Sequence, residues 1–116
     1  MRKQTEIVFI RHGETEFNKA NLYFGHLDPE LNATGRTQLL NTKETLRKIE
    51  KDIDEVFCSP LKRCIESMEI LELEKKMTKN IEESFKELNF GIFEGKTYEQ
   101  ITEEYPEAVK EMRNDW

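Results

Sequence analysis

The feature that most constrains this chain is a short apolar run that ends abruptly in charged residues. Residues 7–10 read Ile-Val-Phe-Ile, which are β-branched or aromatic and do not alternate with polar residues. Such a run is typical of a strand that is buried on both faces, as in a parallel sheet covered by helices. Polarity rises at once in Arg11 and His12, and Gly13 then permits a sharp turn. The run therefore predicts an α/β fold with charged side chains at the end of its first strand.

The following segments continue the alternation of strand and helix. Residues 18–33 have the composition of an irregular loop, and a helix is predicted over 34–51 with Thr34 as its N-cap. A second strand over 53–58 runs into Ser59 and Pro60, an N-cap pair that opens another helix. This βαβα order predicts parallel strands. The apolar positions that support the two helices are Leu39, Leu40, Leu46 and Ile49, and then Leu61, Ile65, Met68, Leu71 and Leu73.

The rest of the chain is less regular. After a lysine-rich turn at 75–79, residues 81–88 are expected to form a short third strand and then a loop, followed by helices at 98–104 and 106–112. The predicted fold is a three-layer α/β/α architecture with a mainly parallel sheet. Two firm strands are too few to cover such a sheet, so residues 1–116 are interpreted as the amino-terminal portion of one domain. An uncovered sheet would favour a homodimer or aggregation.

Composition excludes several classes of function. The 116 residues hold 18 Lys and Arg against 24 Asp and Glu, a net charge of −6, which argues against a nucleic-acid partner. No apolar run is long enough for a signal peptide or a membrane span, so a cytoplasmic location is expected, with Cys58 and Cys64 both reduced. The two histidines, His12 and His26, lack the spacing of a zinc site, so no metal is expected.

The charged residues after the two predicted strands form a candidate phosphate site. Arg11 and His12 follow one strand, and Arg63 lies in the first helical turn after the other. The carboxyl ends of parallel strands meet at one edge of a sheet, where ligands of α/β proteins bind. A guanidinium suits phosphate oxygens, and an imidazole can attack phosphorus to give a phosphohistidine. Taken singly, each residue is more simply explained as a structural histidine or a solvated arginine.

A loop rich in glycine and phenylalanine supplies a candidate acid. Glu87 lies among Leu88, Phe90 and Phe93, and a carboxylate in apolar surroundings can serve as a general acid. The alternative is a loop carboxylate that caps a backbone N–H.

Four segments in this order resemble the histidine phosphatase superfamily, also called the phosphoglycerate mutase-like family. They are RHGETEFN (11–18), YFGHLDPELNATG (23–35), CSPLKR (58–63) and ELNFGIFEG (87–95). Arg-His-Gly alone would be a weak signal, whereas four ordered motifs across nearly the whole chain are a strong one. The resemblance implies a small phosphorylated metabolite as substrate and chemistry without a metal or other cofactor, because arginines offset the phosphate charge.

The resemblance also implies roles for individual residues. His12 matches the phosphorylated nucleophile, and Glu87 matches the carboxylate that protonates the leaving oxygen and later activates water. Phosphate-binding positions are matched by Arg11, Asn18 and Arg63, and Gly25 matches a loop position whose backbone approaches the substrate. Glu14 and Thr15 are expected to orient the loop, and His26 to be a partly exposed loop residue.

Departures from the family pattern are equally informative. The family has a second essential histidine, on a late strand and followed by glycine, that this sequence lacks. The 116-residue chain is therefore expected to be weakly active or inactive on its own. A non-catalytic phosphate-binding half-domain is the alternative from a different functional class.

The branch of the family is inferred from the substrate loops. Phosphoglycerate mutases usually have Ser or Thr where this chain has Phe24, and their substrate-gripping Lys and paired Arg correspond here to Tyr98 and to Arg113 with Asn114. The motifs look most like α-ribazole phosphatase-type bacterial phosphatases. We therefore expect phosphomonoester hydrolysis through a phosphohistidine, with α-ribazole 5'-phosphate as one candidate substrate and mutase-type phosphoryl transfer as the alternative.

Overall fold

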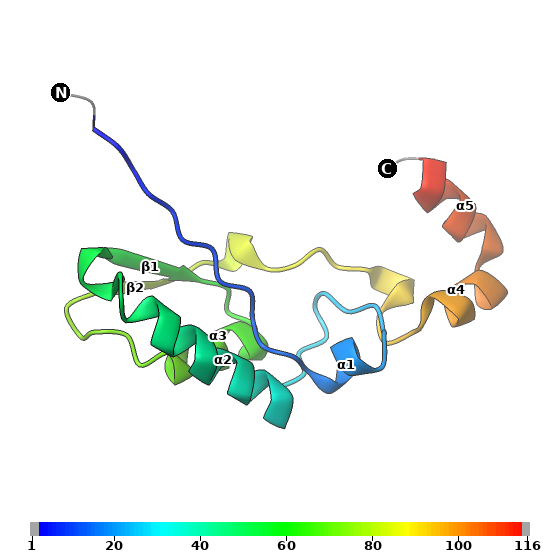
Figure 1. Ribbon diagram of the computed structural model, residues 1–116. Coiled ribbons are helices and arrows are strands. Elements are labelled where there is room, and N and C mark those ends of the chain that lie inside the picture. Colours follow the sequence, from blue (N-terminus) through cyan, green and yellow to red (C-terminus); the bar gives the residue numbers. More distant parts are fainter. Residues whose placement is uncertain (1–2, 115–116) are drawn as a thin grey trace.

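The computed structural model describes residues 3–114 and shows a mixed α/β arrangement around a small parallel sheet (Figure 1). Strands β1 (Glu55–Cys58) and β2 (Thr78–Ile81) pair in parallel, with Glu55 opposite Thr78 and Cys58 opposite Ile81. Helix α3 (Lys62–Ile70) connects them, as expected for parallel neighbours. The mainly parallel sheet is confirmed for this pair, whereas the parallel pair expected from the βαβα order was residues 7–10 with the strand at 53–58.

The core lies where the helices meet the sheet. Helix α2 (Ala33–Leu46) packs against α3, and α3 packs against β1. Leu40 and Ile49, predicted to face the core, are largely exposed. The buried core cluster consists of Leu39, Leu46, Leu71, Leu73 and Met77. The core thus uses fewer apolar positions than the helical pattern predicted.

Two helix starts differ from the prediction because other side chains satisfy the first N–H groups. Helix α2 begins after Asn32, whose side-chain oxygen accepts from the Gly35 N–H at 2.8 Å, so Asn32 and not Thr34 is the N-cap. The helix ends at Leu46, and a 3-10 turn follows at Glu50–Asp52. Ser59 does not cap α3 directly; its hydroxyl accepts from the N–H of Leu61, the residue immediately before the helix.

The first predicted strand is not formed. Residues 7–10 form an extended segment (Figure 1) that is not part of the two-stranded sheet, and Ile7 and Phe9 are 69% and 89% exposed. A strand needs a neighbour for its backbone N–H and C=O groups. Within residues 3–114 no strand pairs with this run. Its apolar side chains, which were expected to be buried on both faces, are therefore exposed.

The third strand was predicted slightly too late. Strand β2 covers 78–81, and residues 83–85 form a 3-10 turn where the strand was expected to continue. Lys79 therefore belongs to the strand and not to the lysine-rich turn. The sheet of the described residues has two strands, and the three-layer arrangement stays a prediction.

The remaining helices lie to one side of this core. Helix α1 (Glu16–Lys19) is a single turn, and a third 3-10 segment at Gly91–Phe93 precedes helices α4 (Tyr98–Glu104) and α5 (Pro106–Asn114). The two late helices and the break at Pro106 match the prediction. The radius of gyration is 17.3 Å, against about 13 Å for a compact domain of this length, because the two ends project outward (Figure 1). No helix among residues 3–114 has the length and apolarity to cross a membrane.

Candidate functional site

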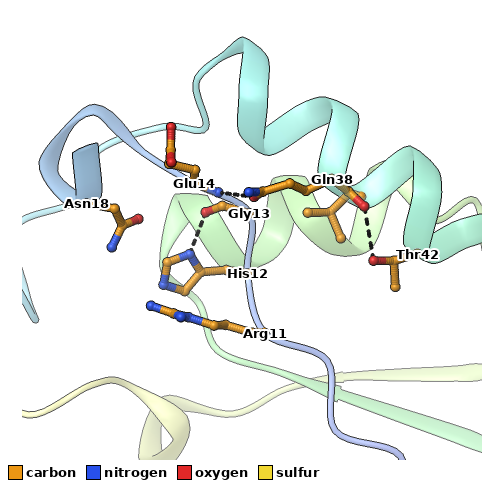
Figure 2. Close-up of a pocket in the computed structure, with 8 residues that line it drawn as sticks. Arg11, His12, Gly13, Glu14, Asn18, Gln38 and Thr42 are labelled. Carbon is orange, nitrogen blue, oxygen red and sulfur yellow. Dashed lines mark hydrogen bonds between the residues drawn. The ribbon is translucent and has the colours of Figure 1, made fainter.

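A hollow of about 310 Å³ lies beside the polar residues that follow the 7–10 run (Figure 2). It is lined by Arg11, His12, Gly13, Glu14, Asn18, Gln38, Leu39 and Thr42. Three of the residues predicted for the site, Arg11, His12 and Asn18, thus share one concave surface. Gln38 and Thr42, one turn apart on α2, were not predicted as site residues. For this helix the sequence pattern predicted only the apolar core positions.

The orientation of His12 leaves one ring nitrogen available. The Nδ1 atom lies 2.7 Å from the carbonyl oxygen of Gly13 (Figure 2). A carbonyl oxygen only accepts, so Nδ1 must carry the proton and donate it. The Nε2 atom of neutral His12 then holds the lone pair, which is the form a nucleophilic imidazole requires.

The surroundings of His12 favour this neutral form. Burial lowers the pKa of His12 below 6.5, and the positive charges of Arg63 and Arg11 lower it further. The hydrogen bond to the Gly13 carbonyl and the negative charge of Glu87 act in the opposite direction. The net lowering keeps the imidazole largely unprotonated near pH 7.

Glycines bring the His12 loop into direct contact with α2. A Cβ on Gly35 would lie 2.2 Å from the Glu14 carbonyl oxygen, and one on Gly13 would lie 2.6 Å from the Gly35 oxygen. The Glu14 N–H donates to the Gln38 side chain, and Asn32 donates to the Glu14 carboxylate at 3.0 Å. The loop that carries His12 is thereby held against the start of α2.

Asn18 has both a structural contact and a free donor group. Its Oδ1 accepts from the backbone N–H and hydroxyl of Thr15, which completes a capping box on α1. These bonds occupy the oxygen of the side chain, so the Nδ2 group is the donor left for a ligand in the hollow. Glu14 and Thr15 both make contacts that orient the loop, as expected.

Arg63 is 2% exposed and lies beneath the loop that contains Gly25. Its Nη1 donates to the Leu27 carbonyl at 3.1 Å and its Nη2 to the Gly25 carbonyl at 2.9 Å. The buried Nε–H has no hydrogen-bond acceptor among residues 3–114. Because a buried donor without a partner is costly, Nε is a group that an oxyanion beside His12 could satisfy.

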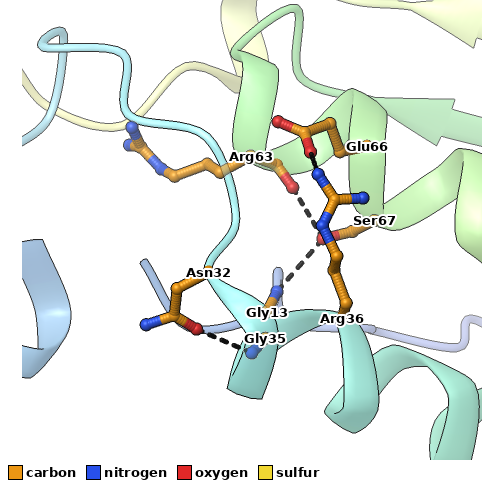
Figure 3. Close-up of polar contacts among 7 residues, drawn as sticks. All are labelled: Gly13, Asn32, Gly35, Arg36, Arg63, Glu66 and Ser67. Carbon is orange, nitrogen blue, oxygen red and sulfur yellow. Dashed lines mark hydrogen bonds and ion pairs between the residues drawn. The ribbon is translucent and has the colours of Figure 1, made fainter. Parts of the chain in front are cut away.

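A buried serine connects Arg63 to the His12 loop (Figure 3). The Ser67 hydroxyl donates to the Arg63 carbonyl at 2.6 Å and accepts from the Gly13 N–H at 3.1 Å. Nearby on the surface, Arg36 and Glu66 form an ion pair at 2.9 Å between α2 and α3. Ser67 was not predicted from the sequence. The one signal for it is its position four residues after Arg63, which places both residues on the same face of α3.

Glu87 and His26 lie on more open surface. Glu87 is exposed, and its carboxylate accepts from the neighbouring Leu88 N–H at 2.9 Å. The apolar surroundings expected for it are therefore not found, although its charge acts on His12. His26 is exposed, as expected, and its side chain is not among those that line the hollow.

The described residues do not supply a metal site. No group of three or more His, Cys, Asp or Glu side chains among residues 3–114 could hold a metal ion. Cys58 and Cys64 are both free, and burial raises the pKa of each thiol, that of Cys58 to about 11.

Comparisons with known proteins agree on one family. Residues 7–116 match the family model described as histidine phosphatase superfamily (branch 1). The chain is 38% identical over 106 residues to phosphoglycerate mutase-like protein 4 of Arabidopsis thaliana, covering 90% of this chain and 46% of that protein. It is 31% identical over 103 residues to the 2,3-bisphosphoglycerate-dependent phosphoglycerate mutase of Streptococcus sanguinis, covering 86% and 45%.

Solved structures show the same relationship. The α-ribazole phosphatase of Shigella flexneri superposes with a TM-score of 0.82 at 31% identity, covering 92% of this chain and 52% of that one. A mycobacterial glucosyl-3-phosphoglycerate phosphatase in complex with VO3 superposes with a TM-score of 0.74 at 28% identity, covering 88% and 50%. The chain thus spans about half the length of the relatives it matches.

Proposed function

Because the chain belongs to branch 1 of the histidine phosphatase superfamily, we propose that its hollow binds the phosphoryl group of a phosphomonoester and that His12 attacks it. The observation that carries this proposal is the hydrogen bond of His12 to the Gly13 carbonyl, which leaves Nε2 unprotonated beside Arg11 and Asn18. Neutral imidazole next to cationic donors is the arrangement that phosphoryl transfer to nitrogen requires.

The reaction proceeds in two displacements. The Nε2 lone pair forms a bond to phosphorus while the bond to the ester oxygen breaks, and Glu87 gives its proton to the departing alkoxide. A water molecule then attacks the phosphohistidine, loses its proton to Glu87, and releases inorganic phosphate and neutral His12. Arg11, the Arg63 Nε–H and the Asn18 amide stabilise the negative charge on the phosphoryl oxygens in both steps. Gly25 brings its backbone close to the substrate.

The substrate is proposed to lack the carboxylate of phosphoglycerate. Phe24 stands before Gly25, Tyr98 carries no charge, and the Arg113 guanidinium donates to the Tyr98 hydroxyl, so the cations that grip the carboxylate in mutases are not matched here. The likeness to α-ribazole phosphatases supports α-ribazole 5'-phosphate as one candidate substrate. The likeness to phosphoglycerate mutases supports phosphoryl transfer to a second phosphoglycerate as the alternative.

A non-catalytic phosphate-binding role is the second candidate. It is favoured by the exposure of Glu87, whose carboxylate accepts from the Leu88 N–H alone among the described residues and does not line the hollow. In this case the chain binds phosphate through the same residues and forms no covalent intermediate.

Trapping the phosphohistidine separates these proposals. The 116-residue chain is incubated with p-nitrophenyl phosphate, and acid-labile phosphate on His12 is measured by mass spectrometry, with His12→Gln as the control. Label on His12 with release of inorganic phosphate supports hydrolysis, and transfer of the label to 3-phosphoglycerate supports the mutase alternative. Binding of inorganic phosphate without label supports the non-catalytic role. A chain that shows neither binding nor label contradicts a phosphate site at His12.

A further inference from the structure

One carboxylate outside the predicted site holds together the two loops that flank it. Glu94 follows the 3-10 turn at 91–93, and its carboxylate accepts three backbone hydrogen bonds from a loop nearly seventy residues away. The Gly25 N–H donates to both carboxylate oxygens, at 3.0 and 2.8 Å, and the His26 N–H donates to Oε1 at 2.7 Å. N–H groups that donate to a carboxylate are among the stronger hydrogen bonds in proteins.

Backbone contacts on either side of Glu94 fix the same two loops. The Tyr23 N–H donates to the Lys96 carbonyl at 2.8 Å, and the Gly95 N–H donates to the Tyr23 carbonyl at 2.7 Å. A Cβ on Gly25 would lie 1.6 Å from the Leu88 carbonyl oxygen, so the loops meet without room for a side chain. Glu94 therefore lies at the centre of a continuous seam between residues 23–26 and 88–96.

The loop that Glu94 holds also binds the guanidinium of Arg63. The carbonyl of Gly25, whose N–H is bound by Glu94, accepts from Arg63 Nη2, and the Leu27 carbonyl accepts from Nη1. Peptide planes are rigid, so the place of the Gly25 N–H and the His26 N–H constrains the carbonyls around them. Any movement of residues 25–27 would turn the guanidinium and redirect the free Nε–H.

We propose that Glu94 is a positioning residue, which fixes the 23–28 loop and through it the orientation of the Arg63 guanidinium. This inference rests on the proposed phosphate site, and Glu94 itself does not contact the phosphoryl group. Glu94 and the candidate acid Glu87 lie on the same loop. The contact therefore also connects the loop of Glu87 to the 23–28 loop, which binds Arg63. This role requires a hydrogen-bond acceptor of the length and charge of a glutamate side chain. Substitutions at position 94 that change the length or the charge separately can therefore test it.

The test compares four variants of the 116-residue chain. Glu94→Ala removes the acceptor, Glu94→Asp shortens it by one methylene, and Glu94→Gln keeps one oxygen but places an NH2 donor against the Gly25 N–H. Glu103→Gln, a change on the exposed face of α4, is the matched control. Inorganic phosphate binding is measured by calorimetry on protein shown to be folded by circular dichroism, and hydrogen exchange of the Arg63 Nε–H is followed by NMR without phosphate.

Glu94→Ala and Glu94→Asp are expected to bind phosphate roughly ten- to a hundredfold more weakly and to exchange the Arg63 Nε–H faster. Glu94→Gln is expected to fall between them and the wild type, and Glu103→Gln to match the wild type. A merely structural role would lower thermal stability but leave the phosphate affinity of the folded protein and the Nε–H exchange unchanged, and that result would overturn the proposal.

The two readouts also separate this inference from the proposed function. If wild-type protein fails to bind phosphate, the proposed site is wrong, but Arg63 exchange still decides whether Glu94 positions the guanidinium. If wild-type protein binds phosphate and Glu94→Ala binds it equally well, the positioning role is wrong and the phosphate site stands.

Discussion

The guanidinium carbon of Arg63 lies 4.6 Å from the centre of the Phe24 ring, so a buried cation rests on an aromatic face. The same ring meets His12 edge-on, with 6.4 Å between ring centroids. Phe24 thus contacts both the candidate nucleophile and the arginine. An aromatic residue at this position shields both groups from water and attracts the cation through its ring quadrupole.

Replacing this ring should affect stability and binding together. Phe24→Leu keeps apolar volume but removes the cation–π contact, which is expected to cost about 1–2 kcal/mol of unfolding free energy in urea. Phosphate affinity should fall as well, because Arg63 loses one of its constraints. Phe9→Leu, at an exposed position, is the control and should change stability by less than about 0.5 kcal/mol. Equal effects of the two substitutions would show that the Arg63–Phe24 contact contributes nothing.

The lowered pKa of His12 predicts a pH dependence of stability. Because the folded pKa lies below 6.5, the unfolded chain binds more protons between the two values. The contribution of His12 to stability should therefore be fully present above pH 6.5 and be lost as the pH falls through the folded pKa. Urea unfolding of the wild type and of His12→Gln across this range measures the contribution of His12 to the free energy of unfolding. The wild type should lose stability relative to His12→Gln as the pH falls, and a gain relative to that variant would contradict the prediction.

Charge substitutions around His12 test the cause of the shift. Arg11→Met removes a nearby positive charge and should raise the pKa of His12, whereas Glu87→Gln removes a negative charge and should lower it. NMR titration of the His12 ring protons reads both changes directly. If Glu87→Gln leaves the titration unmoved, Glu87 is too far from His12 to act as the proposed acid.

Local patterns in the sequence predicted what depends on neighbours in the chain. The strand at 55–58, the helix α3 that follows it and the place of Arg63 in the first turn of α3 all follow from strand and helix signals within about 15 residues. The helices predicted at 98–104 and 106–112, with a break at Pro106, are present as α4 and α5, and the structure shows in addition a capping box at Thr97.

Long-range contacts explain what the sequence did not predict. The Glu94 carboxylate and the Gly25 N–H are separated by 69 positions, and no periodic pattern records such a meeting. The run at 7–10 was predicted as a buried strand because its composition is suited to burial, yet pairing depends on a partner strand that its own residues do not specify. Glu87 was placed among apolar neighbours in sequence that do not enclose it in space.

The contact between the His12 loop and α2 predicts a strong effect at one glycine. Gly35→Ala would place a methyl group 2.2 Å from the Glu14 carbonyl oxygen, so two backbone segments must separate. The expected loss is about 3 kcal/mol of unfolding free energy, with weaker phosphate binding because the His12 loop moves. Gly91→Ala is the control: its new methyl group meets no atom of residues 3–114 within 4 Å, and the positive φ of 55° should cost about 1 kcal/mol. A smaller loss for Gly35→Ala than for Gly91→Ala would exclude the close contact.

The exposed run at 7–10 predicts concentration-dependent self-association. Its four apolar side chains are 39–89% exposed, and within residues 3–114 its backbone has no partner strand. Unpaired extended backbone with apolar side chains is a template for edge-to-edge pairing. We expect the wild-type chain to form dimers or larger species as its concentration rises, and Phe9→Lys to shift it toward monomer. Thr102→Lys adds the same charge on exposed α4 and is the control. Sedimentation velocity over a concentration series measures the change. A wild-type chain that stays monomeric throughout, or a Phe9→Lys chain that associates like Thr102→Lys, would show that this run does not mediate contact between copies.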